Sequence, residues 1–186
     1  MRKNFGVKPW TYPQPVFIVA AYDENGVPCA MNAAWGGIHY DDQIALCLSA
    51  HHKTVANILA TKAFTVSIAD ADHVVECDYV GVVSGNKVPD KFTKAGFTEI
   101  KSEFVNAPII NELPMTVECK LVSYNPETCH MVGEIVNVSA DEKILDENGK
   151  IDPSKLRAIT FDPVNNGYLD LGARVGNAFK DGLKLK

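Results

Sequence analysis

The sequence predicts a mainly β protein, an antiparallel barrel with two flanking helices. Short strand-like runs recur at short spacing along the chain, whereas only two segments have helical periodicity. The strand-helix-strand alternation of a doubly wound fold is absent, and so are the glycine-rich patterns GxGxxG and GxxxxGK[ST]. These observations favour an antiparallel barrel over a parallel sheet with helices on both faces.

The first third of the chain has the pattern of a β-meander. Val16–Tyr22 is an apolar run rich in β-branched and aromatic residues, and it ends at the hairpin signal DENG (23–26). Pro28–Ala34 is the expected return strand, and Gln43–Ser49 is the expected third strand. Three antiparallel strands therefore precede the first helix.

Helical spacing of apolar residues predicts helices over Lys53–Thr61 and His73–Val83, with a strand over Phe64–Ile68 between them. Two long strands are expected later, over Met115–Tyr124 and Met131–Ala140, separated by the turn NPETCH. The stretch FDPVNNGYLDLGARVG near the end is expected to be a loop. No repeat or linker interrupts residues 1–186, so one domain is expected.

Composition narrows the classes of function. The formal net charge is −5 and the acidic residues are spread along the chain, so no basic stripe indicates nucleic-acid binding. No apolar run is long enough to span a membrane or to serve as a targeting segment, and the cytoplasm is the expected location. The five cysteines lack any CxxC spacing and are expected to be reduced and mostly buried. The adjacent His51 and His52 have no third ligand nearby, so no metal site is expected.

The segment NAAWGGI (32–38) is the first candidate binding element. Small residues and two glycines surround Trp35 at the end of a predicted strand. Glycine lets the backbone approach a flat ligand, and the indole can supply a stacking surface. The alternative is a tight barrel corner with a tryptophan in the core.

Two further segments carry groups that suit an anion. In SAHHKTVAN (49–57), hydroxyls and Lys53 cluster where a strand gives way to a helix, whose first amides attract negative charge. In YVGVVSGNKVPDKF (79–92), backbone amides and lysines occupy a turn-rich stretch. The alternatives are ordinary helix capping for the former and a solvated loop for the latter. No Ser-His-Asp order or carboxylate pair stands out, and no catalytic residue is assigned.

Taken in order, these segments resemble the flavin reductase-like family, whose members have an FMN-binding split barrel. The resemblance begins with NFGVKPWTYPQPVFIVAAYDENGVPCAMNAAWGGI, which looks especially like the flavoredoxin branch. It continues through KTVANI, VVECDYVGVVSGNKVPDKF and VGEIVNV, and so covers nearly the whole chain.

The resemblance implies a Greek-key-like split barrel that pairs as a homodimer, with FMN near the dimer interface. By position, the residues expected to contact the isoalloxazine ring are Asn32, Ala33, Ala34 and Trp35. Those expected to hold the ribityl chain and phosphate are Ser49, Ala50, Lys53, Thr54 and Asn57. Those expected to close over the phosphate are Ser84, Gly85 and Lys87, with Lys91 and Phe92 nearby.

The implied function is electron transfer through bound FMN, as an FMN-dependent oxidoreductase of flavoredoxin type. The alternatives are an NAD(P)H:FMN oxidoreductase that supplies reduced flavin to a partner, and a non-redox binder of flavin or nucleotide. Many members that use NAD(P)H carry a histidine five residues before the glycine that matches Gly133. That position is Thr128 here, and His130, with the same strand parity, lies three residues before the glycine. This departure favours a redox partner protein over NAD(P)H as the electron donor.

Overall fold

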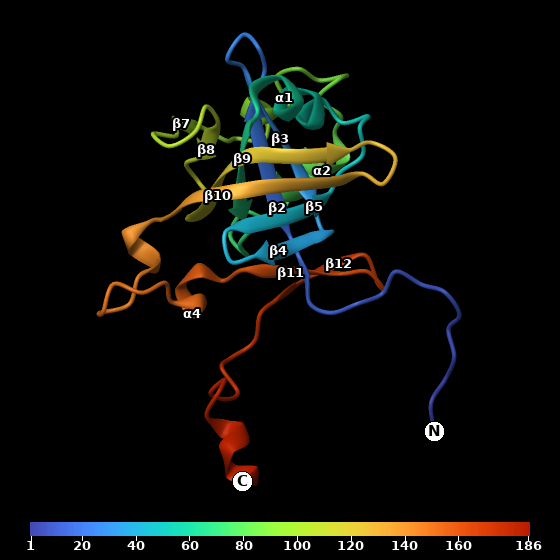
Figure 1. The fold of residues 1–186 in the computed structure, drawn as a ribbon, viewed down its shortest axis with the longest axis vertical. Coiled ribbons are helices and arrows are strands. Elements are labelled where there is room, and N and C mark those ends of the chain that lie inside the picture. Colours follow the sequence, from blue (N-terminus) through green and yellow to red (C-terminus); the bar gives the residue numbers. More distant parts are fainter.

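The computed structural model describes residues 1–186 and shows a mainly β protein with a split antiparallel barrel (Figure 1). Its main sheet has seven antiparallel strands in the order β3-β2-β6-β9-β10-β5-β4. The strands are β2 (Phe17–Tyr22), β3 (Pro28–Ala33), β4 (Gly36–Tyr40), β5 (Gln43–Cys47), β6 (Ala63–Ile68), β9 (Met115–Asn125) and β10 (His130–Ala140). The predicted fold class is confirmed.

The remaining strands form two smaller sheets. A three-stranded sheet joins β1 (Gln14–Pro15), β11 (Ile159–Asp162) and β12 (Gly167–Asp170), and a hairpin joins β7 (Glu99–Lys101) to β8 (Pro108–Ile110). The expected loop near the C-terminus was therefore wrong, since it contains most of the β11–β12 hairpin. Strands β11 and β12 have only four residues each, too few for a clear alternating pattern.

The two predicted helices are confirmed as α1 (Lys53–Thr61) and α2 (Val74–Val82). Shorter helical turns are α3 (Lys91–Lys94), α4 (Pro153–Leu156), η1 (Glu142–Ile144) and η2 (Asp181–Leu185). No helix has both the length and the apolar character that crossing a membrane requires.

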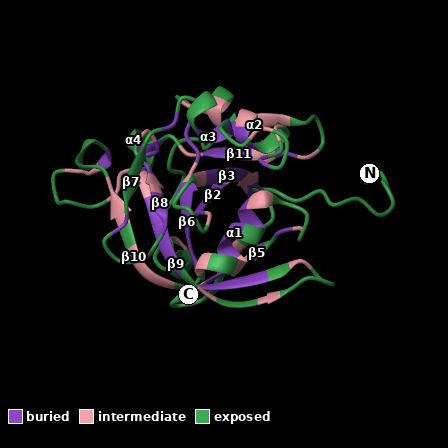
Figure 2. Cartoon of the chain, turned by 90° about the horizontal axis from the view of Figure 1, so that it is seen from above, coloured by how far each residue is buried: buried purple, intermediate pink, exposed green.

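The core has two main parts, on the two faces of the curled sheet (Figure 2). Helix α1 packs Val55 and Ile58 against Phe64 of β6, and all three side chains are fully buried. Helix α2 packs Val80 with Ile18 of β2 in the second part. Complete burial of side chains of this size stabilises a fold by about 1.5–3 kcal/mol each, so this packing holds both helices on the barrel.

The cysteines are all free thiols, and three of the five are buried: Cys29, Cys77 and Cys119. Burial raises the pKa of Cys77 and of Cys119 to about 12, so both thiols stay protonated at neutral pH. The three buried thiols meet the expectation of mostly buried cysteines, whereas Cys47 on β5 is exposed and Cys129 is intermediate.

Candidate functional site

Two cavities lie along β3, one near each end of the strand. The first, called here the Lys53 cavity, has a volume of about 330 Å³ and is lined by Asp23, Val27, Pro28, Cys29, Lys53, Asn57, Gly85, Asn86 and Pro89. The second, the Tyr168 cavity, has a volume of about 270 Å³ and is lined by Asn32, Ala34, Asp78, Gly81, Val82, Phe161 and Tyr168. Residues from β3 and from the region around α2 contribute to both.

Helix α1 begins at the Lys53 cavity with unused hydrogen-bond donors. Its N-cap residue is His52, whose side chain makes no capping bond. The backbone oxygen of His52 accepts from the amides of Val55 and Ala56, whereas the amides of Lys53 and Thr54 donate to no atom of the protein. Unpaired amides at a helix start carry a partial positive charge that favours an anion.

Asn57, one turn further along α1, adds a buried donor to the same cavity. Its side chain is only 3% exposed, and Nδ2 has no hydrogen-bond partner in the protein. A buried donor without a partner costs about 1–3 kcal/mol, so such a group calls for a specific explanation. A ligand that accepts from Nδ2 would supply one.

The loop after α2 closes one side of the Lys53 cavity. A Cβ added to Gly85 would lie 2.9 Å from the Cys29 sulfur and 3.2 Å from the Lys53 Cβ. The neighbouring Asn86 donates from Nδ2 to the backbone oxygen of His51 at 2.9 Å. Close packing and this hydrogen bond therefore hold the loop against the start of α1.

One acidic residue, Asp23, also lines this cavity. Its Oδ1 accepts from the amides of Asn25 and Val27, both at 2.9 Å. The hydrogen bond from Val27 is the largest cause that lowers the pKa of Asp23, so this carboxylate stays ionised within its own turn. The ammonium of Lys53 lowers the pKa further, which leaves the cavity with both charge signs.

Lys91 is almost completely buried, and its ammonium group is held by backbone oxygens of the protein. Its Nζ donates to the backbone oxygens of Val80 and Val83, both at 2.9 Å, and so satisfies carbonyls at the end of α2. Burial lowers the pKa of Lys91. It lies near His52, whose pKa is lowered by burial first and then by the charge of Lys91.

The Tyr168 cavity is organised by a pair of side chains. The Tyr168 hydroxyl donates to Oδ1 of Asp78 at 2.7 Å, and burial followed by this hydrogen bond raises the pKa of Tyr168. Asn32 donates from Nδ2 to the backbone oxygen of Cys77 at 3.1 Å. A Cβ on Gly81 would lie 2.9 Å from the Asn32 Cβ, so glycine allows α2 to approach β3 closely.

The predicted site residues divide between these places. Lys53, Asn57 and Gly85 line one cavity, and Asn32 and Ala34 line the other. The Ala33 side chain lies in the core, and Trp35 is 54% exposed and lines neither cavity. The remaining predicted residues line neither cavity. Each lies within four residues of one that lines the Lys53 cavity: Ser49, Ala50, Thr54, Ser84 and Lys87.

Some lining residues were missed at the sequence level. Cys29 looked like an ordinary buried thiol, but its sulfur lies 3.4 Å from the Thr54 hydroxyl and faces the Lys53 cavity. Phe161 and Tyr168 were assigned to a loop, and their place beside Asn32 depends on a pairing across most of the chain. No local pattern could have signalled that pairing.

The strand parity assumed for Thr128 and His130 was wrong. Thr128 lies in the turn before β10, where its amide donates to Oδ1 of Asn125 at 3.2 Å. Cys129 between them has a φ of 60°, a left-handed conformation that breaks the alternation of a strand. His130 is the first residue of β10 and pairs with Cys47 of β5, and its ring lies 5.9 Å from that of His39.

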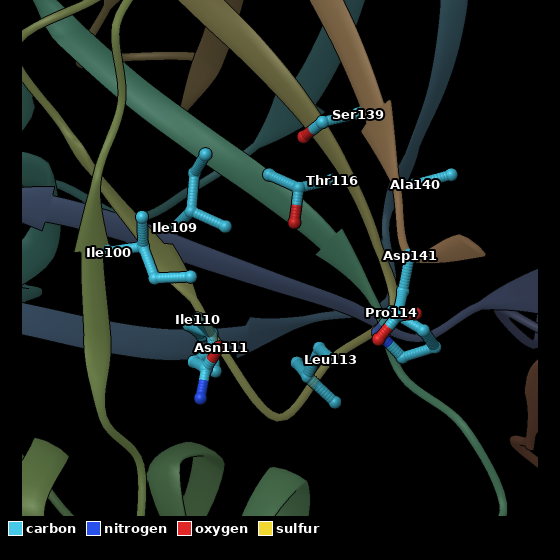
Figure 3. A pocket seen from close by; sticks show the side chains of 10 residues that line it. All are labelled: Ile100, Ile109, Ile110, Asn111, Leu113, Pro114, Thr116, Ser139, Ala140 and Asp141. Carbon is cyan, nitrogen blue, oxygen red and sulfur yellow. The ribbon is translucent and has the colours of Figure 1, made fainter. Parts of the chain in front are cut away.

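A third hollow lies beside the β7–β8 hairpin and the ends of β9 and β10 (Figure 3). Its volume is about 300 Å³, and it is lined by Ile100, Ile109, Ile110, Asn111, Leu113, Pro114, Thr116, Ser139, Ala140 and Asp141. It contains none of the predicted site residues. The carboxylate of Asp141 is its only charged group, and it already accepts from the Lys143 amide at 2.9 Å. No basic side chain lines this hollow and a carboxylate does, so it does not favour an anion.

Comparison with known proteins places the chain and its fold in a family. The family model described as flavin reductase like domain matches residues 10–156. A flavoredoxin of Desulfovibrio vulgaris (Miyazaki F) is 36% identical, with 98% of this chain and 100% of that chain covered and a TM-score of 0.93. A flavoredoxin from Methanosarcina acetivorans is 27% identical, with coverage of 100% and 98% and a TM-score of 0.86.

An FMN-binding domain of a flavin reductases-like enzyme from Shewanella baltica OS155 has the same fold. It is 17% identical, covers 88% of this chain and 89% of its own, and has a TM-score of 0.76. The family model alone spans more than half of the sequence. The chain therefore belongs to the family of flavin reductase like domains.

Proposed function

We propose that this chain is a single FMN-binding domain of flavoredoxin type that transfers electrons through bound flavin. The observation that carries the proposal is the convergence of donors at the Lys53 cavity. Lys53 and Asn57, whose side-chain amide has no partner, line the cavity, and the two free amides at the start of α1 adjoin it. No hydrogen bond within the protein uses the amides or Asn57 Nδ2.

A phosphate group fits this donor set. It carries about −1.5 to −2 charges at neutral pH and three oxygens that accept strong hydrogen bonds. The helix dipole and Lys53 oppose that charge, and Asn57 gains the partner that it lacks. Gly85 is part of the fit, because a side chain at that position would contact Lys53 and Cys29.

The second end of the ligand is expected at the Tyr168 cavity. A strand advances about 3.3 Å per residue, so Cys29 and Ala34 lie roughly 16 Å apart along the chain. That span suits an elongated ligand with an anionic group at one end and a ring at the other. Backbone amides of Ala33 to Trp35 and the indole of Trp35 would then orient the ring.

Bound FMN would supply a ring that accepts a hydride or single electrons. The chain's own contribution is to hold the phosphate through Lys53 and Asn57 and to present the ring at an exposed face near Trp35. The Trp35 side chain is 54% exposed, which leaves room for a flavin ring or for a protein surface against its indole. A redox partner protein is our preferred electron donor.

A second candidate function is that of an NAD(P)H:FMN oxidoreductase. It is favoured by the exposed His130 at the start of β10, which pairs with Cys47 close to the turn before α1. The altered position of this histidine relative to Gly133 weighs against direct use of nicotinamide. Reduction by NADH and NADPH under anaerobic conditions distinguishes the two functions.

We further propose that the protein works as a homodimer in the cytoplasm. The unpaired edge strand β4 supports the dimer, because Ile38 and Tyr40 on it are 73% and 65% exposed. The five free thiols support a reducing compartment.

The decisive experiment is an FMN titration of the purified protein, followed by anaerobic mixing with NADH or NADPH. We expect a bound yellow species, and little bleaching by either nicotinamide. Lys53→Glu should weaken FMN binding at least about tenfold, since it removes an attraction and adds a repulsion. Lys120→Glu, the same charge change on the exposed side of β9, is the matched control. Failure of the wild-type protein to bind FMN would overturn the proposal, and rapid bleaching would assign the reductase function.

A further inference from the structure

Gln14 carries a buried side-chain atom that has no hydrogen-bond partner in the protein. The residue is 5% exposed, and its Oε1 accepts from no donor. The other such atom is Nδ2 of Asn57, at the Lys53 cavity. A buried polar atom without a partner is costly, so each of the two calls for a specific explanation. Asn57 lacks an acceptor, whereas Gln14 lacks a donor.

The three-stranded sheet places Gln14 beside the Tyr168 cavity. Gln14 of β1 pairs with Phe161 of β11, and Phe161 pairs with Tyr168 of β12. Residues directly opposite one another on antiparallel strands project from the same face, with their Cβ atoms about 4.5–5.5 Å apart. Gln14 therefore extends the row of side chains formed by Phe161 and Tyr168, the two residues of this sheet that line the cavity.

The main sheet brings Gln14 to the same place by a second route. Phe17, three residues further along the chain, pairs with Ala33 at the end of β3. Three residues of extended chain span at most about 10 Å, so Gln14 lies near this end of the strand. Ala34 follows directly and lines the Tyr168 cavity. Two independent strand pairings therefore place Gln14 near this cavity.

Hydroxyl groups around Gln14 already donate to other atoms. Thr160 donates from Oγ1 to the backbone oxygen of Gln14 at 2.7 Å. The Tyr168 hydroxyl donates to Oδ1 of Asp78, also at 2.7 Å. A hydroxyl has a single proton, so neither group can donate to the Gln14 side chain as well. A bound ligand can supply the missing donor.

Two free backbone donors lie at the same end of β3. Ala34 and Trp35 connect β3 to β4, and their amides donate to no atom of the protein. An acceptor together with two donors is complementary to an imide edge, in which an N–H lies between two carbonyl groups. The only N–H of the oxidised flavin ring, N3–H, lies in such an edge. The polar groups at this end of β3 therefore match the ring as well as its class of ligand.

We propose that Gln14 binds the flavin ring, with its Oε1 accepting the hydrogen bond from N3–H. The inference rests on the proposed function and assigns a side chain to the ring end of the ligand. Gln14 then recognises the ring, while Lys53 and Asn57 recognise the phosphate. A site that hydrogen-bonds a polar group rejects an analogue without that group, because the buried partner is left unpaired. The protein should therefore discriminate FMN from FMN that is methylated at N3.

The test is a pair of fluorescence titrations, one with FMN and one with N3-methyl FMN. The wild-type protein should bind the methylated flavin at least about tenfold more weakly. Gln14→Met keeps the shape of the side chain and removes the acceptor, so it should bind FMN at least about tenfold more weakly and lose the discrimination. Gln43→Met, the same change on β5 away from both cavities, should keep the wild-type affinities and is the matched control.

Further measurements separate the ring end from the phosphate end and from folding. Lys53→Glu should weaken the binding of both flavins by the same factor, because both carry the phosphate. Flavin-free Gln14→Met should unfold at an equal or higher urea concentration than the wild type, since it loses an unpaired buried acceptor. In the wild type, the N3 proton of bound ¹⁵N-labelled FMN should be protected from exchange with water in NMR spectra.

The outcomes distinguish this inference from the proposed function. A wild-type protein that binds FMN and N3-methyl FMN equally overturns the inference and leaves the proposed function intact. The same conclusion follows if Gln14→Met keeps the wild-type preference, or if the N3 proton exchanges as fast as in free FMN. If Gln14→Met does not fold, the exchange rate in the wild type decides. A wild-type protein that binds neither flavin overturns the proposed function and this inference with it.

Discussion

Gly85 lies directly against Lys53, with room for no side chain between the loop after α2 and the start of α1. A Cβ at position 85 would lie 3.2 Å from the Lys53 Cβ and 2.9 Å from the Cys29 sulfur. The backbone of this loop can therefore approach the helix start only because residue 85 is glycine.

Gly85→Val is expected to weaken FMN binding at least about tenfold, because the added side chain displaces Lys53 or the loop from the cavity. Gly167→Ala is the control, since a Cβ there would have no neighbour within 4 Å. Fluorescence titration with FMN measures both. Equal affinities for the two variants would show that the contact between Gly85 and Lys53 has no part in binding.

Asn57→Leu is expected to separate stability from binding. The change removes a buried donor without a partner, so the free energy of unfolding of the flavin-free protein should stay equal or rise. FMN affinity should fall at least about tenfold, because the ligand loses a hydrogen bond from a buried amide.

The matched control for this prediction is Asn137→Leu. Asn137 donates to Oε1 of the buried Glu118 at 2.7 Å, so its removal should destabilise the fold by about 1–3 kcal/mol and leave FMN affinity unchanged. Urea unfolding measures the free energy of unfolding of both variants, and FMN titration measures their affinities. Destabilisation by Asn57→Leu, without loss of affinity, would contradict a ligand role for Asn57.

Asp162 is expected to make the attachment of the N-terminal arm, residues 1–12, depend on pH. Hydrogen bonds from Tyr12, Asn165 and Val164 lower the pKa of Asp162 to about 2. Because the unfolded value is about 3.9, the ionised carboxylate stabilises the fold above that pH. This contribution is lost as the pH falls from about 4 toward 2.

The measurement is the urea midpoint of the wild-type protein and of Asp162→Asn from pH 7 down to pH 2. The wild type should be more stable at pH 7, and the difference should shrink below pH 4. Asp170→Asn, at an exposed carboxylate that accepts no hydrogen bond, should show no such difference. A gap between Asp162→Asn and the wild type that stays constant with pH would contradict this role.

Gly133→Ala is expected to destabilise the barrel by about 1–3 kcal/mol through overpacking. Its Cβ would lie 2.4 Å from Cζ of Phe64, whose side chain is completely buried. Gly37→Ala on the exposed edge strand β4 has no neighbour within 4 Å and serves as the control. Chemical unfolding compares the two, and equal stability would mean that Phe64 moves aside without cost.

Local patterns predicted the central elements well. Residues 53–61 formed the predicted helix because Val55 and Ile58 recur at helical spacing above a buried sheet. The turn DENG joined β2 to β3 because Asp23 accepts from two amides of its own turn. In each case the cause lies within a few residues, so the sequence alone could reveal it.

Features that depend on distant partners were not predictable in this way. The strand β4 was not predicted, because an exposed edge strand shows no alternation of apolar residues. The two cavities along β3 need the β11–β12 hairpin and the loop after α2, which only the folded barrel places there. Cys129 adopts a left-handed conformation that no composition rule signals, so the orientation of Thr128 was misjudged.

The small sheet that joins Gln14 to Phe161 also sets the order in which a newly made chain can finish folding. On a ribosome the N-terminal strand β1 waits without a partner until β11 has been synthesised, because β11 is the strand with which it pairs. Until then the aromatic N-terminal arm has no anchor at Asp162, and closing so long a loop adds to the entropy cost of the last step. Completion of the small sheet beside the Tyr168 cavity therefore reports that β11 has been translated, and a chain cut short before β11 would leave β1 unpaired.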